Sequence, residues 1–180
     1  MPPKVSITKD MILSAAFELV REDGFENLTS RKLAKRLNCS IQPIFHTYKN
    51  MDALKEDLLE VSNEYFGNYL QSSISSDNAL LSIGLAYIDF AKNESKLFKL
   101  LFLSGNIDVK NLADLVSAQE HSFILQNISE VEELNDKAKL FLSSWIYIHG
   151  IACIVVANPV SFSREEILEL LQQYKKNQAH

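Results

Sequence analysis

The stretch that decides the fold of this chain is Gly24-Phe25-Glu26-Asn27-Leu28-Thr29-Ser30-Arg31-Lys32-Leu33-Ala34-Lys35-Arg36-Leu37-Asn38-Cys39-Ser40-Ile41-Gln42-Pro43-Ile44-Phe45-His46-Thr47-Tyr48. It predicts two short helices joined by a tight turn, with Thr29 and Ser40 capping their N-termini. Asn38 occupies the turn, where it tolerates a left-handed backbone better than most residues other than glycine. This order is typical of a helix-turn-helix, whose second helix can enter the major groove of DNA.

The composition of the whole chain favours an all-α fold. The chain has 180 residues, of which 47% are apolar, with only five glycines and four prolines. Long stretches therefore lack the residues that interrupt helices, and no segment has a convincing strand pattern. We expect about nine helices, divided between a three-helix head over residues 1–50 and a helical body over residues 51–180.

Amphipathic spacing and capping residues place the other helices. Thr8 caps the first, Gly24 ends it, and Ser129 with Glu132 and Ser163 with Glu166 resemble capping boxes. With the two helices of the motif, Ser30–Leu37 and Ser40–Tyr48, the expected ranges are Thr8–Asp23, Met51–Ile74, Asn78–Ala91, Ser95–Leu103, Asp108–Ile128, Asp136–Ala157 and Arg164–Asn177.

Charge is distributed unevenly along the chain. The net charge is -5, yet residues 1–55 hold nine Lys or Arg against six Asp or Glu, while the remainder holds nine against seventeen. A modestly basic head on an acidic body fits a DNA-binding protein with weak, salt-sensitive non-specific affinity.

Cys39 and Cys153 have no spacing typical of a zinc finger or a disulfide framework, so we expect no metal and no cofactor.

No feature of the sequence indicates secretion or a membrane. Residues 1–10 are polar and are not followed by the apolar run of a signal peptide. The most apolar stretch, Trp145–Ala157, is short for a bilayer-spanning helix. We therefore expect a cytoplasmic protein with no membrane partner.

Over residues 8 to about 60 the chain resembles the tetracycline-repressor (TetR) family of transcriptional regulators. The resemblance rests on Ala-Ala-Phe-Glu-Leu at 15–19, Asp-Gly-Phe-Glu at 23–26, Thr-Ser-Arg-Lys-Leu-Ala at 29–34, Ile-Phe-His-Thr-Tyr-Lys-Asn at 44–50 and Ala-Leu at 53–54. It implies a DNA-binding head, a helical ligand-binding body and a homodimer built mainly from the last two helices. It also implies that a small molecule releases a repressor from its DNA operator.

Three positions depart from the family's commonest pattern. Phe45 stands where Tyr is usual, Asn38 replaces a frequent turn Gly, and Met51 replaces a common Lys. The first and third changes remove groups that can bind phosphate. Tyr48, Lys49 and Lys55 are possible substitutes for them.

The second helix of the motif supplies the candidates for reading bases. Gln42 can form a bidentate contact with an adenine edge, and Ile41 or Pro43 can touch a thymine methyl group. Ile44 is expected to point into the core. The other side chains expected on the exposed face are Phe45, His46 and Thr47. An ordinary surface helix with a solvated glutamine is the alternative.

The candidates for binding phosphate lie at helix N-termini, where free N–H groups attract anions. Thr29, Ser30 and Arg31 begin the first helix of the motif, but Thr29 is needed as a cap whether or not DNA is bound. Lys32, Lys35 and Arg36 are more often a solvated face than a contact.

The body is rich in aromatic and soft side chains. Because Trp145, His149 and Cys153 follow one another at intervals of four, they share a helix face. With Tyr87, Phe90, Phe98 and Phe102 they could line a pocket for an apolar or aromatic effector, although plain core packing explains many such residues. A metal pair or a nucleophile with its base lacks a third group at a readable spacing.

These observations predict a ligand-responsive, dimeric regulator that binds double-stranded DNA. An enzyme would need an acid, a base and a nucleophile in one constellation, and none is readable. The remaining alternative is a helical ligand-binding or adaptor protein whose head no longer binds DNA.

Overall fold

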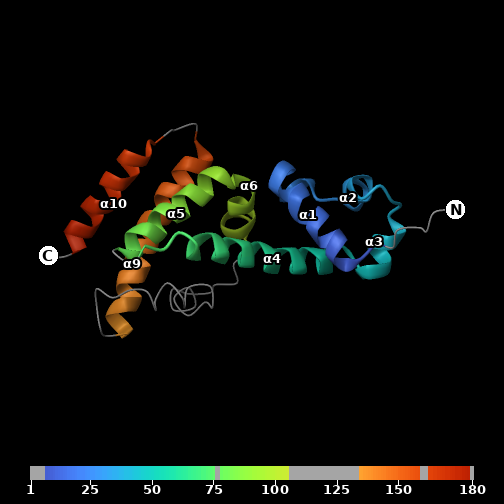
Figure 1. Ribbon diagram of the computed structural model, residues 1–180, viewed down its shortest axis with the longest axis horizontal. Coiled ribbons are helices and arrows are strands. Elements are labelled where there is room, and N and C mark those ends of the chain that lie inside the picture. The colour runs from blue at the N-terminus through green and yellow to red at the C-terminus, as the bar shows by residue number, and fades with distance from the viewer. Residues whose placement is uncertain (1–6, 76–77, 106–133, 159–161, 179–180) are drawn as a thin grey trace. The chain divides into compact units, whose positions relative to one another are not determined.

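The computed structural model of the chain describes residues 7–75, 78–105, 134–158 and 162–178 (Figure 1). Every regular element in these ranges is helical, and they contain no strand. Their eight α-helices are close to the nine expected, and the all-α prediction is confirmed. The expected helix over 108–128 and the expected capping box of Ser129 with Glu132 lie outside these ranges.

The described residues separate into two compact units. The first contains the residues up to Tyr65 together with the segment that begins at Lys96. The second contains Phe66–Ser95 and the described residues from 134 onward. The sequence placed the end of the head at residue 50, whereas the first unit also takes in most of the following helix.

The first unit contains the stretch Gly24–Tyr48 and the helices before and after it. Thr8 caps the first helix, as expected, by accepting a hydrogen bond from Met11 N at 3.2 Å. Gly24 ends it at φ +94°, a backbone conformation that residues other than glycine rarely adopt. The elements are α1 (Lys9–Asp23), the 3-10 turn η1 (Phe25–Asn27), α2 (Ser30–Arg36), α3 (Gln42–Thr47) and α4 (Met51–Gln71).

The helix-turn-helix is formed by α2 and α3. Thr29 caps α2 by accepting from Lys32 N at 3.2 Å, and Asn38 adopts the expected left-handed turn at φ +50°. The expectation that Ser40 caps the next helix is wrong, because α3 begins one residue later and Ile41 occupies its N-cap position without a side-chain bond. Pro43 lies in the first turn of α3, where a missing N–H costs little.

The long helix α4 carries the chain from the first unit into the second. Asn50 caps it by accepting a hydrogen bond from Ala53 N at 2.9 Å. The helix then continues for 21 residues without a break, of which the residues after Tyr65 belong to the second unit. Leu54 and Leu58 are fully buried on its inner face.

The second unit is built on α5 (Ala79–Asn93), which packs along α9 (Leu134–Ala157) and also contacts α10 (Arg164–Gln178) (Figure 1). Gly84 permits this close approach, because a Cβ there would lie 3.0 Å from Ile148 Cδ1 and 3.4 Å from Leu171 Cδ1. Ser163 and Glu166 form the expected capping box at the start of α10, with bonds of 2.7 and 3.1 Å. After α5 the chain forms α6 (Ser95–Phe98), which continues into the π-helical η2 (Lys99–Leu103). From Lys96 onward these residues belong to the first unit.

The apolar stretch of helix α9 is longer than the stretch Trp145–Ala157 identified in the sequence. Residues Ala138–Ala157 form a 20-residue stretch of mean hydropathy 2.0, long and apolar enough to cross a membrane by length and composition alone. The expectation that the most apolar stretch is too short is therefore wrong, because Phe141 and Leu142 extend it toward the N-terminus. One such helix is weak evidence for a membrane span, since a core helix of a soluble protein passes the same test.

Candidate nucleic-acid interface and body cluster

Helix α3 exposes both polar and apolar side chains and buries one residue in the core. Ile44 is fully buried, as expected. Ile41 and Phe45 are 44% and 42% exposed and, four positions apart, form an apolar patch on one face. Gln42, His46 and Thr47 are also exposed, and Pro43 is half-buried. The six residues predicted to read bases therefore lie together on α3 and at its start.

The hydroxyl of Thr47 already has a partner inside the helix. Its Oγ1 donates to the carbonyl oxygen of Pro43 at 3.1 Å. Such a bond to the preceding turn leaves the oxygen free to accept a further hydrogen bond.

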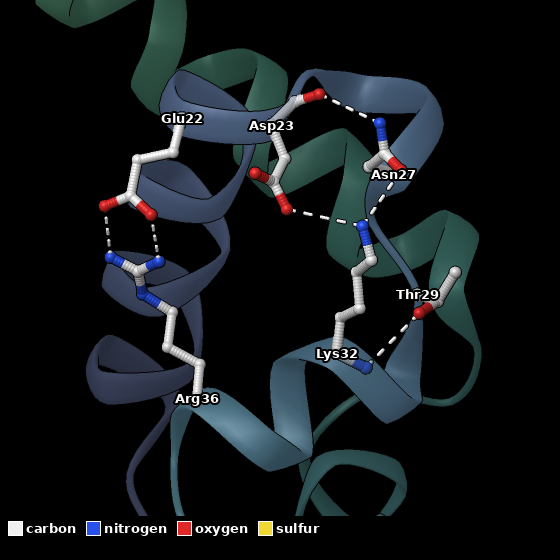
Figure 2. Close-up of polar contacts among 6 residues, drawn as sticks. All are labelled: Glu22, Asp23, Asn27, Thr29, Lys32 and Arg36. Carbon is white, nitrogen blue, oxygen red and sulfur yellow. Dashed lines mark hydrogen bonds and ion pairs between the residues drawn. The ribbon is translucent and has the colours of Figure 1, made fainter.

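Two of the four basic side chains on α2 are held by acidic side chains at the end of α1 (Figure 2). The guanidinium of Arg36 donates two hydrogen bonds to the carboxylate of Glu22, at 2.6 and 2.7 Å. These bonds hold the pKa of Glu22 below its usual value. A bidentate pair fixes geometry as well as charge, so this contact sets α2 against α1.

Lys32 is held by Asp23 at the end of α1 and by Asn27 in the turn that follows. Its ammonium lies 3.3 Å from Asp23 Oδ2 and donates to Asn27 Oδ1 at 2.9 Å, while Asn27 donates in turn to the carbonyl oxygen of Asp23 (Figure 2). Arg31 and Lys35, by contrast, are exposed and make no ion pair with any described residue. The sequence could not separate Lys32 and Arg36 from Arg31 and Lys35, because the partners of the first two lie outside α2.

The three proposed substitutes for lost phosphate contacts differ in their surroundings. Lys49 is exposed. Lys55 is half-buried, pairs with Asp52 at 3.2 Å and lies over the ring of Phe25 at 5.7 Å. Tyr48 is only 4% exposed.

Tyr48 has an internal role that the sequence did not reveal. Its hydroxyl donates to Asp57 Oδ2 on α4 at 3.0 Å, and the ammonium of Lys9 reaches the same oxygen at 2.6 Å. Burial raises the pKa of Tyr48 well above its usual value, and the Lys9 hydrogen bond lowers the pKa of Asp57. At neutral pH the contact therefore joins a neutral phenol, a carboxylate and an ammonium.

In the second unit, four of the residues predicted to line an effector pocket meet in one cluster. Trp145 stacks on His149 with ring centroids 4.6 Å apart and planes 11° apart. The two ring nitrogens of His149 contact Tyr87 Oη at 2.8 Å and Cys153 Sγ at 3.3 Å. The shared face predicted for Trp145, His149 and Cys153 is therefore present, and Tyr87 on α5 completes it.

The cluster is uncharged at neutral pH. Burial lowers the pKa of His149 and raises the pKa of the Cys153 thiol. A neutral imidazole has one donor and one acceptor nitrogen, so it can serve both neighbours at once. A protonated thiol is a poor nucleophile, and the arrangement is that of a partly buried hydrogen-bonding site in an aromatic wall.

The other three predicted pocket residues lie elsewhere in the fold. Phe90 belongs to the second unit and packs against Phe66 and Tyr69 of α4, at centroid distances of 4.9 and 5.3 Å. Phe98 and Phe102 belong to the first unit and pack on each other at 5.0 Å.

Within the first unit, a cavity of about 430 Å³ is lined by none of the residues predicted to bind an effector. Its lining consists of Gly24, Phe25, Glu26, Lys96, Lys99, Leu100, Leu103 and Ser104.

Comparison with known proteins gives matches to the head and to the whole fold. Residues 12–58 match the family described as bacterial regulatory proteins, tetR family. In Bacillus subtilis (strain 168), the HTH-type transcriptional regulator YobS is 23% identical over 95% of this chain and 90% of its own length. The probable HTH-type transcriptional regulator YttP of the same organism is 25% identical over 72% of this chain and 66% of its own length.

Two solved structures share the fold. A TetR variant from Acinetobacter baumannii AYE, in complex with minocycline, superposes with a TM-score of 0.58 at 17% identity, covering 94% of this chain and 97% of that one. A transcriptional regulator from Rhodococcus sp. Rha1 gives 0.56 at 16% identity, covering 90% of both chains.

Proposed function

Because this chain is a transcriptional regulator whose head belongs to the TetR family, we propose that it is a homodimeric repressor released from a palindromic operator by a small molecule. The match of residues 12–58 to the tetR family confirms the family resemblance seen in the sequence. Its relatives are named as transcriptional regulators, a kind of protein that is not enzymatic. A role in transcription supports a cytoplasmic location.

The observation that carries DNA binding is the exposed face of α3 on a buried anchor. Ile41 and Phe45 expose large apolar surfaces that solvent does not favour and that thymine methyl groups and sugar edges can cover. Gln42 follows Ile41 in the chain, is exposed, and can reach an adenine edge. Thr29, Ser30, Arg31, Lys49 and Lys55 are the proposed phosphate contacts, and Tyr48 supports the helix from inside.

Helix α9 supports the proposal of a homodimer. Only 28% of its most apolar window is buried, and Ile146 and Ile154 are 54% and 46% exposed. A soluble protein rarely leaves so large an apolar face uncovered. A second copy of the same helix, related by two-fold symmetry and joined by α10, would cover it. The two α3 helices would then meet successive major grooves of a palindromic site.

The body cluster supports the proposal of a small-molecule effector. Trp145, His149, Tyr87 and Cys153 offer an aromatic wall with polar atoms, which suits an apolar or aromatic ligand. The cluster reaches α4 through Phe66, whose ring packs on Tyr87 at 5.6 Å. A ligand that binds one arrangement of α4 better than another would shift the population of DNA-binding dimers. The TetR variant of similar fold was solved in complex with minocycline, which supports this part of the proposal.

Selection from random duplex DNA tests the DNA-binding part. We expect the full chain to enrich a palindrome, and Gln42→Ala to lose about 1–3 kcal/mol per half-site and relax the base preference there. Gln71→Ala, at an exposed position on α4, is the matched control and should bind as the wild type does. If no sequence is enriched, the chain is instead a ligand-binding or adaptor protein with an inactive head.

Fluorescence tests the effector part, because Trp145 is the single tryptophan of the chain. A library of apolar and aromatic compounds is screened for those that change its emission. We expect compounds that do so to weaken DNA binding at the same concentration. A compound that releases DNA while leaving the emission unchanged would place the effector site away from Trp145.

A further inference from the structure

Asp57 is an acidic residue in the first unit, which contains the helix-turn-helix. Phosphate binding depends on positive charge, so a carboxylate close to α3, the proposed recognition helix, lowers the affinity for DNA. Asp57 is nevertheless only 29% exposed, and its carboxylate contacts Tyr48 and Lys9. We propose that Asp57 is a positioning residue that locks the end of the recognition helix to α4, and that DNA binding depends on this lock. The inference rests on the DNA-binding function proposed above.

The geometry brings three elements to one oxygen. Asp57 Oδ2 accepts from Tyr48 Oη at 3.0 Å and from Lys9 Nζ at 2.6 Å. Tyr48 ends α3, Lys9 begins α1 and Asp57 lies in the second turn of α4. Lys9 also lies over the ring of Tyr48, 5.6 Å from its centroid, so the three groups contact one another in a closed set.

The position of Tyr48 makes this contact important for the recognition helix. Tyr48 is the C-cap of α3, and its backbone N–H donates to the carbonyl oxygen of Ile44 at 2.8 Å. Only two residues separate it from the start of α4 at Met51. Because α3 has just six residues, it has little stability of its own and takes its direction from such tertiary contacts. A bond that ties its last residue to α4 therefore fixes the direction in which Gln42 and Phe45 point.

The sign of a charge change separates this role from simple electrostatics. Asp57→Asn removes a negative charge, so electrostatics alone predicts tighter DNA binding. The neutral amide that replaces the carboxylate also binds the ammonium of Lys9 more weakly. The positioning role therefore predicts weaker binding to DNA. Glu56→Gln is the matched control, since Glu56 is the neighbouring exposed carboxylate on α4 and makes the same charge change.

The experiment measures binding of the full chain to the selected palindrome and to a random duplex, at a temperature where circular dichroism shows every variant folded. We expect Asp57→Asn to weaken binding to the palindrome about tenfold. Binding to the random duplex should change much less, because that binding does not depend on the direction of α3. Glu56→Gln should leave palindrome binding equal or tighter. Tyr48→Phe, which keeps the buried ring, should weaken it as well, and the double variant should be no worse than Asp57→Asn alone.

Each outcome assigns a separate cause. If the wild type enriches no DNA sequence, the proposed function fails. If the wild type binds but Asp57→Asn binds as tightly as Glu56→Gln, the positioning role is wrong. If Asp57→Asn does not fold, Tyr48→Phe decides alone, and unchanged palindrome binding by that variant overturns the proposal. Equal losses on the palindrome and the random duplex would also overturn it, because a general loss of affinity is not a loss of direction.

Discussion

Two helix glycines should respond in opposite ways to the same substitution. Replacing a helix-interior glycine by alanine stabilises a helix by about 0.5–1 kcal/mol, because it reduces the freedom of the unfolded chain. At Gly67 on α4, no described heavy atom outside the local helix backbone lies within 4 Å of the new Cβ. The full gain is therefore expected, which corresponds to a rise in Tm of about 1–4 °C for a chain of this size.

At Gly84 the same methyl group meets a packed neighbour. The new Cβ would lie 3.0 Å from Ile148 Cδ1 and 3.4 Å from Leu171 Cδ1, in the contact between α5, α9 and α10. Overpacking of this kind costs about 1–3 kcal/mol, which outweighs the gain in the helix. We therefore expect Gly84→Ala to lower the free energy of unfolding by up to about 2 kcal/mol.

Thermal unfolding of the two variants followed by circular dichroism, at equal protein concentration, measures both effects. A lower Tm for Gly67→Ala, or a higher one for Gly84→Ala, would show that the packing around these helices differs from that described.

Three further predictions concern assembly, charge and pH. Ile154→Glu, at an exposed position on the apolar face of α9, should give monomers or aggregates in analytical ultracentrifugation, and a fully dimeric variant would contradict the proposed interface. Arg31→Gln should lower DNA affinity on all sequences and reduce its salt dependence by about one phosphate contact, whereas Arg36→Gln should mainly lower Tm. The folded-state pKa values of Glu22 and Asp57 are lowered, so their stabilisation is present above their unfolded pKa values of about 4 and is lost as the pH falls through the folded ones. The Tm should therefore fall below about pH 4, and less steeply in Glu22→Gln.

Most of the fold could be predicted because its signals are local. Thr8, Thr29 and Asn50 cap helices by bonds to residues three positions along, and a cap needs only the right side chain at the right place. The shared face of Trp145, His149 and Cys153 follows in the same way from their spacing of four. The failures at Ser40 and at the length of the apolar stretch in α9 concern boundaries, which depend on the neighbouring backbone.

The contacts that join distant segments could not be predicted. Nothing in the sequence pairs Tyr48 with Asp57, or Tyr87 with His149, because each pairing depends on how two helices pack. Tyr48 illustrates the consequence for site prediction. Its place after the recognition helix suggested an exposed phosphate contact, whereas packing against α4 turns it inward.

The ion pairs within the head bear on how a regulator of this kind searches a genome. Among residues 7–55, Lys9, Arg21, Lys32, Arg36 and Lys55 all face carboxylates of the same unit. Of the basic residues in this range, Arg31, Lys35 and Lys49 would be able to bind phosphates without giving up an ion pair within the unit. Such a head leaves non-specific DNA quickly, since sequence-independent residence depends on the number of phosphates neutralised. The protein would then sample the chromosome by many brief encounters, and its occupancy of an operator would depend mainly on the bases read by α3.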